Sequence, residues 1–523
     1  MPNSSGRKYY GKKTVPFQRL QNDRSNQAPR CGRCTWKGDL SMSAIIKNAE
    51  IYLGDGSNGD AVARAFDQEE ISIRELRAAL KGQVIAPGDA GYDQARSVFY
   101  GGFDHRPALI IRPVDATEVS LVVSLARESG LPLAVRSGGH SNAGHSVSDG
   151  GITLDLRDMR ALEIDPESRT AWAETGLTTG EYTAAAAEYG LATGFGDTGS
   201  VGIGGITLGG GVGYLVRKHG LTIDDLLAAE VVTADGRILR ADAERHPDLF
   251  WALRGGGGNF GVATRFRFRL HPVNQILGGM LFLPATPEVI AGFIAAAEAA
   301  PEELSTIANV MPAPPMPFLP EEQHGRLVLM AMMVYSGDAE AGQHALAPFR
   351  ALAEPLADLL RPMHYPEMFP PEQEDYHPTA VGRTLFADTI DLQAAETIVE
   401  YLQASDANMR VAQLRVLGGA MARIPVEATA FAHRHSRVMV NLAAFYEGPE
   451  DRVVRQAWVA DFAASLQQGD SGAYVNFMGD EGQAQIRQAY PGVTWKRLTA
   501  IKARYDPSNL FRLNQNIPPK QGK

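Results

Sequence analysis

Hydrophobic residues fall along this chain in two patterns, short continuous runs and helically spaced positions. Runs of apolar and β-branched residues predict strands at 108–113, 131–135, 152–156, 162–164, 171–173, 229–233, 237–239 and 262–270. Apolar positions at helical spacing predict helices at 71–80, 117–128, 179–189 and 248–254. The regular alternation of strand and helix that a dinucleotide fold requires is missing. The pattern therefore predicts an α+β fold built from short strands.

The composition changes after Pro272. Residues 276–470 lose the glycine-rich loops and gain prolines and an alanine-rich helix at 287–300. Further apolar runs at 326–335, 411–417 and 437–446 predict an antiparallel sheet with helices on one side. Because 523 residues exceed what a single core holds, we expect at least two domains.

Two glycine-rich segments carry the chemical signal. The first, Val135–Ser141, reads Val-Arg-Ser-Gly-Gly-His-Ser, and the second, residues 194–213, contains ten glycines in twenty positions. Adjacent glycines allow positive φ and leave no Cβ, so successive backbone N–H groups can converge on one anion. The segments therefore predict a phosphate-bearing ligand with His140 beside it. A tight turn with a surface histidine, or a low-complexity linker, is the alternative interpretation.

Three ordered motifs carry a family resemblance. Arg136–Ser141, the segment Val201–Gly213 and the tail Tyr505–Pro519 resemble the bacterial-type berberine-bridge-enzyme-like FAD-linked oxidases, which belong to the vanillyl-alcohol-oxidase (PCMH-type) flavoprotein superfamily. The resemblance implies a PCMH-type FAD-binding domain at 70–275 and a substrate-binding domain at 276–470. It also implies a C-terminal segment, 471–519, that returns to the FAD domain.

The resemblance also implies which residues hold FAD. In the family the histidine of the first motif carries FAD covalently, and that histidine is His140 here. Many plant members have a cysteine as a second tether, but the matching residue here is Thr198. We therefore expect a single covalent bond. The expected cofactor-binding residues are Arg136, Ser137, Gly138, Gly139, His140, Ser141, Gly144, His145, Thr198, Val201, Gly202, Gly204, Gly205, Gly211, Gly213, Tyr214, Val262, Asn514 and Asn516. Val201 falls where the family has a small residue beside the flavin that controls access of oxygen. Core packing is the alternative role for Val201. For Asn514 and Asn516, capping of a terminal turn is the alternative.

The candidate catalytic residues are Tyr474, Asn476 and Asn441. Residues 474–477 resemble the family's Tyr-x-Asn-Tyr segment, although the last position is Phe477. Tyr474 would act as the base, and Asn476 would position the substrate or the ring. A tyrosine with an ordinary pKa of about 10 needs help from a nearby cation or from the flavin. A core aromatic remains the alternative, and Asn441 lies near a substrate-facing position of the family.

Charge and composition limit the partners. The net charge of −10 argues against nucleic acid, and no apolar run is long enough to span a membrane. Residues 1–45 are rich in basic residues and are predicted to be a disordered extension. The two cysteines, Cys31 and Cys34, exclude a disulfide framework and suit a reducing compartment, so we expect a cytoplasmic protein. The histidines show no metal-ligand spacing, and no metal is expected.

The expected activity is that of an FAD-dependent oxidase. It would remove a hydride from an alcohol or amine carbon of a small organic or sugar substrate, and molecular oxygen would be the acceptor, giving hydrogen peroxide. The alternatives are a flavin dehydrogenase with another acceptor and a flavin-binding protein without catalysis. Much of this expectation rests on analogy of fold.

Overall fold

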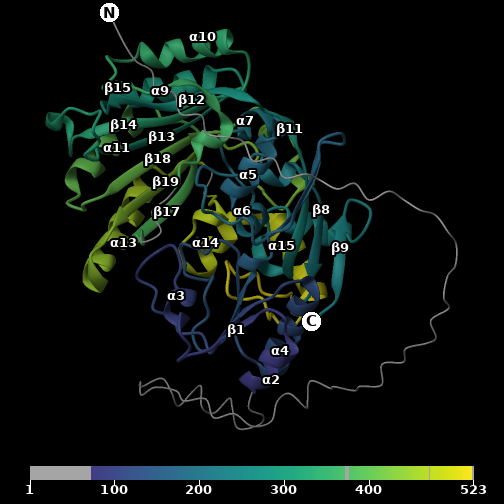
Figure 1. The fold of residues 1–523 in the computed structure, drawn as a ribbon. Helices are drawn as coiled ribbons and strands as arrows, with labels where there is room; N and C mark the ends of the chain where they lie inside the picture. The colour runs from purple at the N-terminus through teal and green to yellow at the C-terminus, as the bar shows by residue number, and fades with distance from the viewer. Residues whose placement is uncertain (1–71, 372–375, 470–471, 521–523) are drawn as a thin grey trace, which may run out of the picture.

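The structure is a computed structural model that describes residues 72–371, 376–469 and 472–520. The basic extension and Cys31 and Cys34 lie outside the described residues. No helix of the described chain is both long and apolar enough to cross a membrane. The elements form three main sheets, and Figure 1 shows the largest of them at the upper left with helices on its outer side.

The first sheet has four strands in the order β1-β2-β4-β3, of which β2, β4 and β3 are parallel. The strands are β1 (Gln83–Ile85), β2 (Leu109–Arg112), β3 (Leu133–Arg136) and β4 (Ile152–Asp155). Helix α4 (Ala116–Ser129) packs on them through Val119, Val122 and Val123. Its N-cap Asp115 accepts the N–H of Glu118, and Gly130 ends it in the left-handed region. The strand β3 delivers the chain directly into the Ser137–Ser141 loop.

The second sheet is antiparallel, in the order β5-β6-β10-β8-β9. Its strands are β5 (Leu162–Asp165), β6 (Thr170–Glu174), β8 (Leu226–Val232), β9 (Ile238–Asp242) and β10 (Val262–Arg269). The strands predicted at 162–164, 171–173, 229–233, 237–239 and 262–270 are confirmed, and the first four form two antiparallel pairs. Along β10 the burial alternates, because Phe266 and Phe268 are fully buried whereas Arg269 is exposed. The α+β expectation is confirmed.

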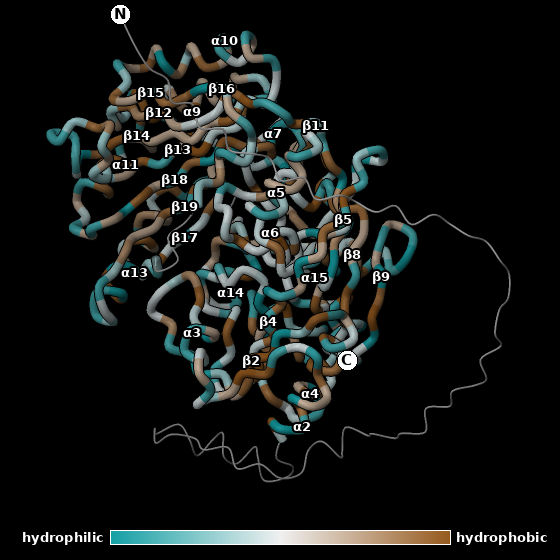
Figure 2. The backbone as a smooth tube through the Cα atoms, in the orientation of Figure 1, coloured by the Kyte–Doolittle hydropathy of each residue, from teal (hydrophilic) through white to brown (hydrophobic). Residues whose placement is uncertain are grey.

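The third sheet has eight antiparallel strands, and β16 pairs with β12 at one edge. The strands are β12 (Gln275–Pro284), β13 (Leu304–Pro312), β14 (Leu327–Tyr335), β15 (Ala357–Asp358), β16 (Arg361–His364), β17 (Ala380–Ala387), β18 (Arg410–Val416) and β19 (Val438–Phe445). Figure 2 shows hydrophobic stretches along β13 in this sheet and along β2 in the first sheet. The sequence predicted only β14, β18 and β19 of the eight.

Helices cover one face of this third sheet, as expected. They are α9 (Pro287–Ala299), α10 (Ala339–Arg350), α11 (Leu392–Ala404) and α13 (Gly448–Ser465), and all four share one core with the strands. The other face carries Asn309, Gln413, Arg415 and Asn441, the residues that alternate with the buried apolar positions. That second face turns toward the glycine-rich segments, since Gln413 and Ala443 line the same cavity as Gly138.

The remaining helices connect or cover these sheets. They are α2 (Ile73–Ala79), α3 (Tyr92–Arg96), α5 (Thr179–Ala187), α6 (Ile203–Gly209), α7 (Val216–His219), α8 (Pro247–Leu253), α12 (Ala420–Arg423), α14 (Gly482–Ala489) and α15 (Gly492–Tyr505), and two short strands, β7 (Leu191–Ala192) and β11 (His271–Pro272), pair with each other. Helix α6 lies inside the glycine-rich segment, where the glycine content gave no indication of a helix.

The C-terminal segment folds back among the earlier elements, drawn in yellow in Figure 1. Helix α15 packs on α8, and Leu498 and Ile501 join the core around the second sheet. A buried ion pair fixes the end of this helix and the turn after it: Lys502 Nζ lies 2.7 Å from Asp506 Oδ2, and both side chains are fully buried.

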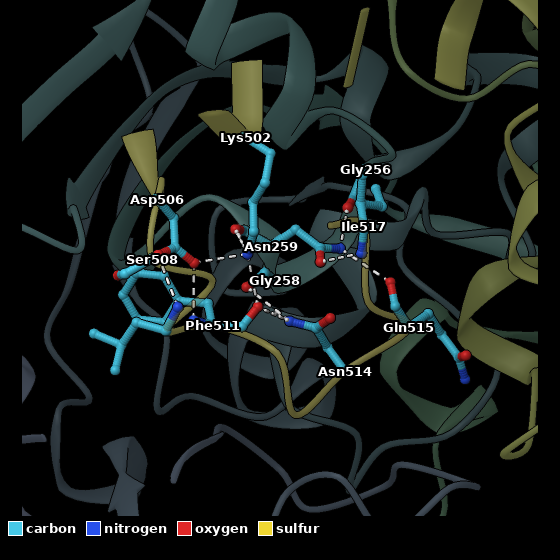
Figure 3. Close-up of polar contacts among 11 residues, drawn as sticks. Gly256, Gly258, Asn259, Lys502, Asp506, Ser508, Phe511, Asn514, Gln515 and Ile517 are labelled. Carbon is cyan, nitrogen blue, oxygen red and sulfur yellow. Dashed lines mark hydrogen bonds and ion pairs between the residues drawn. The ribbon is translucent and has the colours of Figure 1, made fainter. Parts of the chain in front are cut away.

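The ammonium of Lys502 also holds two backbone segments together (Figure 3). Its Nζ donates to the carbonyl oxygens of Asn259, at 2.8 Å, and Phe511, at 2.9 Å. Asp506 accepts the N–H groups of Leu510 and Phe511. The pair therefore joins the short helix η5 (Gly257–Asn259) to residues 510–517.

Replacing Lys502 by methionine is expected to destabilise the fold strongly. The substitution leaves the Asp506 carboxylate buried without its cation, which costs about 3–5 kcal/mol of unfolding free energy. The matched control is Arg504→Met on the same helix, whose partner Asp248 and whose own side chain are both partly exposed, and its cost should stay below about 1 kcal/mol. Urea unfolding of both variants measures the difference, and equal losses would show that the buried pair has no special role.

Candidate flavin site

A cavity of about 680 Å³ lies where the glycine-rich segments meet the third sheet. Most of its lining residues come from five separate parts of the chain, namely residues 137–142, 196–212, 257–263, 474–478 and 511–515. The others include residues 99–100 and 145–146 and a few side chains of the third sheet. A cavity of this size holds a ligand as large as a cofactor or drug.

The loop after β3 is held by a buried ion pair beneath it. Arg136 is completely buried, and its Nη2 lies 2.7 Å from Asp155 Oδ2 on the neighbouring strand β4. The same guanidinium donates to the carbonyl oxygens of Ala95 and Ser97. Arg136 therefore does not line the cavity, and it fixes the loop that does.

The two glycine-rich segments cross at Gly138 and Gly202. A Cβ placed on Gly138 would lie 2.1 Å from the backbone nitrogen of Gly202, and a Cβ on Gly202 would lie 2.1 Å from Ser137 Oγ. Since no side chain fits at either position, both must be glycine for the segments to approach this closely. The N–H of Gly204 also donates to Ser137 Oγ at 3.3 Å, which ties the start of α6 to the loop.

His140 lines the cavity with a half-buried ring. Its Nε2 lies 2.9 Å from Ser200 Oγ, and the ring of Phe99 stacks on it at 4.1 Å between centroids. Burial lowers the pKa of His140 to about 4, although the contact with Ser200 acts in the opposite direction. The imidazole is therefore neutral at neutral pH. If Nε2 donates to Ser200, the lone pair of Nδ1 is free to act as a nucleophile.

Side-chain charge contributes little to this cavity. Among the described residues that line it there is no lysine or arginine, Asp197 is the single acid, and nine are glycines. Gly205 is exposed there although it lies in α6, and no atom of the described residues beyond the local helix backbone and the two chain neighbours would come within 4 Å of a Cβ built on it. A pyrophosphate would thus be bound by peptide N–H groups, and the glycine walls leave room for FAD.

Tyr474 lies in the same cavity, in a site made of hydrogen-bond donors. The backbone N–H of Gly211 and the Nδ2 group of Asn476 each donate to its hydroxyl oxygen at 2.9 Å. Burial raises the pKa of Tyr474, whereas these donors and the charge of Arg415 act to lower it. The side chain of Asn476 also donates to the carbonyl oxygen of Ile206, so α6 and the Tyr474 segment are joined.

Two further side chains near Tyr474 were missed by the sequence analysis. Asp197 lines the cavity, and Arg415 forms an ion pair with it at 2.7 Å. Gln413, also in the cavity wall, accepts from the Nε of Arg415 at 3.0 Å. The alternation of 411–417 could have placed Gln413 and Arg415 on one face of their strand, but no sequence signal links either residue to Asp197.

The residues expected from the sequence to bind the cofactor or to act in catalysis separate into two groups. Fifteen of them line the cavity: Ser137, Gly138, Gly139, His140, Ser141, His145, Thr198, Val201, Gly202, Gly204, Gly205, Val262, Asn514, Tyr474 and Asn476. Seven are not among the residues that line it: Arg136, Gly144, Gly211, Gly213, Tyr214, Asn441 and Asn516.

Residues of the second group pack behind the walls. Gly211 supports Tyr474, and Tyr214 is buried with its hydroxyl donating to Met332 Sδ. Asn441 lies on β19 directly across from Gln413, and its Oδ1 is buried without a partner. Asn514 does line the cavity, and its Nδ2 donates to the carbonyl oxygens of Gly258 and Phe511 (Figure 3).

Comparison with known proteins gives the class of the chain. Residues 107–242 match the family model of the FAD binding domain, and residues 473–518 match the model described as berberine and berberine like. The chain is 30% identical to (R)-6-hydroxynicotine oxidase of Paenarthrobacter nicotinovorans, over 84% of this chain and 98% of that protein. It is 28% identical to the xylooligosaccharide oxidase of Thermothelomyces thermophilus, over 86% of this chain and 95% of that protein.

A solved structure agrees with these matches. The crystal structure of 6-hydroxy-D-nicotine oxidase from Arthrobacter nicotinovorans superposes with a TM-score of 0.76 at 27% identity, over 84% of this chain and 98% of that one. The fold and the matches together define an FAD-binding oxidoreductase. The chain belongs to the berberine-bridge-enzyme-like family of FAD-linked oxidoreductases, and the expected recognition is confirmed.

Alanine at Gly205 is expected to separate cofactor binding from stability. Because nothing in the protein opposes the new Cβ, the exchange should stabilise α6 by up to about 1 kcal/mol. The methyl group should crowd bound FAD at a cost of about 1–3 kcal/mol, which is about 5- to 150-fold in affinity. Thermal unfolding of the apoprotein and titration with FAD measure the two effects. Unchanged FAD affinity would place the cofactor away from this helix.

Proposed function

We propose that this protein is an oxidase that carries FAD on His140 and oxidises an alcohol or amine carbon of a small molecule. The observation that supports it is one cavity containing both a neutral histidine and a tyrosine whose hydroxyl accepts two hydrogen bonds. In this proposal residues 70–275 bind FAD, residues 276–470 contact the substrate, and residues 471–519 complete the FAD site.

His140 is proposed as the single covalent link. A neutral imidazole can attack an electrophilic flavin methyl position, whereas an imidazolium cannot, and burial keeps this ring neutral at neutral pH. Thr198 lines the cavity at the position that matches the second tether, a cysteine, of other family members, and it carries no thiol. The Phe99 ring stacks on the His140 ring at 4.1 Å between centroids and so favours this plane of the imidazole.

Tyr474 is proposed as the base. The chemistry that bound FAD supplies is two-electron transfer, in which a hydride leaves the substrate carbon and oxygen removes both electrons as hydrogen peroxide. The proton of the substrate's O–H or N–H bond would pass to the phenolate oxygen of Tyr474, which would become the neutral phenol. Asn476 and the Gly211 N–H would stabilise the phenolate before that transfer and orient it.

The electron acceptor and substrate class rest on the relatives. Two of them are named as oxidases, one of 6-hydroxynicotine and one of xylooligosaccharides, so an amine and a sugar are both candidate substrates. Turnover in air should therefore release hydrogen peroxide in a one-to-one ratio with product. Faster turnover with a dye under nitrogen, and no peroxide in air, would favour a dehydrogenase instead.

The His140→Ala variant should lose the covalent bond. Acid precipitation of the wild type should give a yellow pellet, and the same treatment of the variant should release FAD into the supernatant. His145→Ala is the matched control, because His145 is also in the cavity wall and should leave the flavin attached. Flavin that stays on the His140→Ala protein would mean that another residue is the tether.

The Tyr474→Phe variant should slow flavin reduction about 10²–10⁴-fold and leave reoxidation by oxygen nearly unchanged. Since burial raises the pKa of Tyr474 above 10, only a small phenolate fraction exists at neutral pH. The wild-type reduction rate should consequently rise about tenfold per pH unit below that pKa, and the variant should lack this rise. Stopped-flow reduction by 6-hydroxynicotine or xylobiose provides both measurements. Equal slowing of both half-reactions would remove Tyr474 as the base.

A further inference from the structure

Arg415 is a buried cation that contacts the walls of the cavity from behind. Its side chain, on β18, is 4% exposed and lies outside the cavity lining. The guanidinium donates from Nη1 to the carbonyl oxygen of Val212 at 3.0 Å and from Nη2 to Asp197 Oδ2 at 2.7 Å. Nε and Nη2 both donate to Gln413 Oε1. These bonds leave the cation no freedom to move away from its place.

Two short chains of contacts connect this cation to Tyr474. Val212 follows Gly211, whose N–H donates to the hydroxyl oxygen. The guanidinium carbon also lies 5.0 Å from the centroid of the Phe477 ring, and that ring meets the Tyr474 ring edge-on at 5.1 Å. A positive charge fixed in a buried region acts strongly on a nearby ionisable group, because little water screens it.

The hydroxyl of Tyr474 has donors around it but no acceptor. Gly211 N–H and Asn476 Nδ2 both point at its oxygen, and within the described chain no carbonyl or carboxylate is hydrogen-bonded to its proton. Such a site favours the phenolate over the phenol, whereas burial favours the phenol. The balance between the two then depends on the net charge nearby.

We propose that the Asp197–Arg415 ion pair sets the proton affinity of Tyr474, with Arg415 favouring the phenolate and Asp197 limiting that effect. Both are positioning residues for the base, and this inference rests on the proposed role of Tyr474. Asp197 is also among the residues that line the cavity.

Among the described residues, the other charged or titratable groups that face Tyr474 have polar partners of their own. The Phe431 ring packs against Tyr474 at 6.3 Å between centroids, and Arg434 lies over that ring at 5.5 Å. Arg434 forms a bidentate pair with Asp224 at 2.7 and 2.8 Å. His433, which also contacts Phe431, hydrogen-bonds to the carbonyl oxygen of Ala489. These groups stay constant when Asp197 or Arg415 is changed.

The two members of the pair should move the Tyr474 titration in opposite directions. Asp197→Asn leaves Arg415 uncompensated, so the pKa of Tyr474 should fall by about one pH unit. Arg415→Gln removes the cation, so the pKa should rise by about one pH unit or more, and Arg415→Lys should restore it towards the wild-type value. Asp358→Asn, in a partly exposed ion pair of the third sheet, is the matched control and should leave the titration in place.

Tyrosinate absorption of the holoenzyme over a pH series measures these changes without any substrate. Subtracting the Tyr474→Phe protein in each background isolates the signal of Tyr474. Titrations that move in opposite directions support the inference, whereas titrations that stay in place, or move in one direction for Asp197→Asn and Arg415→Gln, overturn it. If Arg415→Gln does not fold, Asp197→Asn and Arg415→Lys still give the test, because both retain the cation.

The kinetic result separates this inference from the proposed function. The alkaline rise of the flavin-reduction rate should move with the titration of each variant, so that the rate at a fixed pH changes about tenfold for every pH unit by which the pKa of Tyr474 changes. A titration that moves while the rate profile stays fixed would keep the ion-pair effect and remove Tyr474 as the base. A Tyr474 titration that stays fixed in the ion-pair variants, together with an inactive Tyr474→Phe protein, would keep Tyr474 as the base and remove the ion-pair effect.

Discussion

The close approach of two backbone segments at Gly138 and Gly202 is the constraint on which the rest of the site depends. With 2.1 Å available to a Cβ on either residue, the segments can cross only as bare peptide. The crossing places the His140 loop beside the start of α6, so one wall of the cavity consists of backbone. That wall can bind an anionic cofactor through dipoles, without a basic side chain that would itself need a counter-ion when the site is empty.

Three buried ion pairs support the walls of the cavity, and each of them fixes backbone or cavity-lining groups. Arg136 and Asp155 support the loop of His140, Lys502 and Asp506 join η5 to the C-terminal segment, and Arg415 and Asp197 connect the third sheet to the glycine-rich segment. A buried pair is stable only when its remaining donors are also satisfied. Here backbone carbonyls satisfy several of them, so the desolvated charges position segments that are far apart in sequence.

The sequence predicted what depends on local pattern and missed what depends on long-range contact. Alternation in 262–270 and the glycines of Val135–Ser141 are local, and they led to the correct strand and to the correct family. Helix α6 was missed because glycine content lowers helix propensity, whereas tertiary contacts such as the Asn476 hydrogen bond stabilise it. The strand β12 was missed as well, and it pairs with β14 instead of with the next strand along the chain, β13. The strand β13 was also missed, although it pairs with the consecutive strand β14 as well as with the distant β18.

The same distinction holds within the site. Tyr474 and Asn476 came from a local motif, and both line the cavity. Asn441 also came from its approximate place in the sequence, but the register of β19 sets it beside Gln413 on the neighbouring strand, outside the cavity lining. Arg415 and Asp197 are 218 residues apart, so nothing short of the fold could pair them. A nearby cation was one of the two aids, besides the flavin, that the sequence suggested for a tyrosine base, and Arg415 is such a cation on a strand predicted only from its apolar residues.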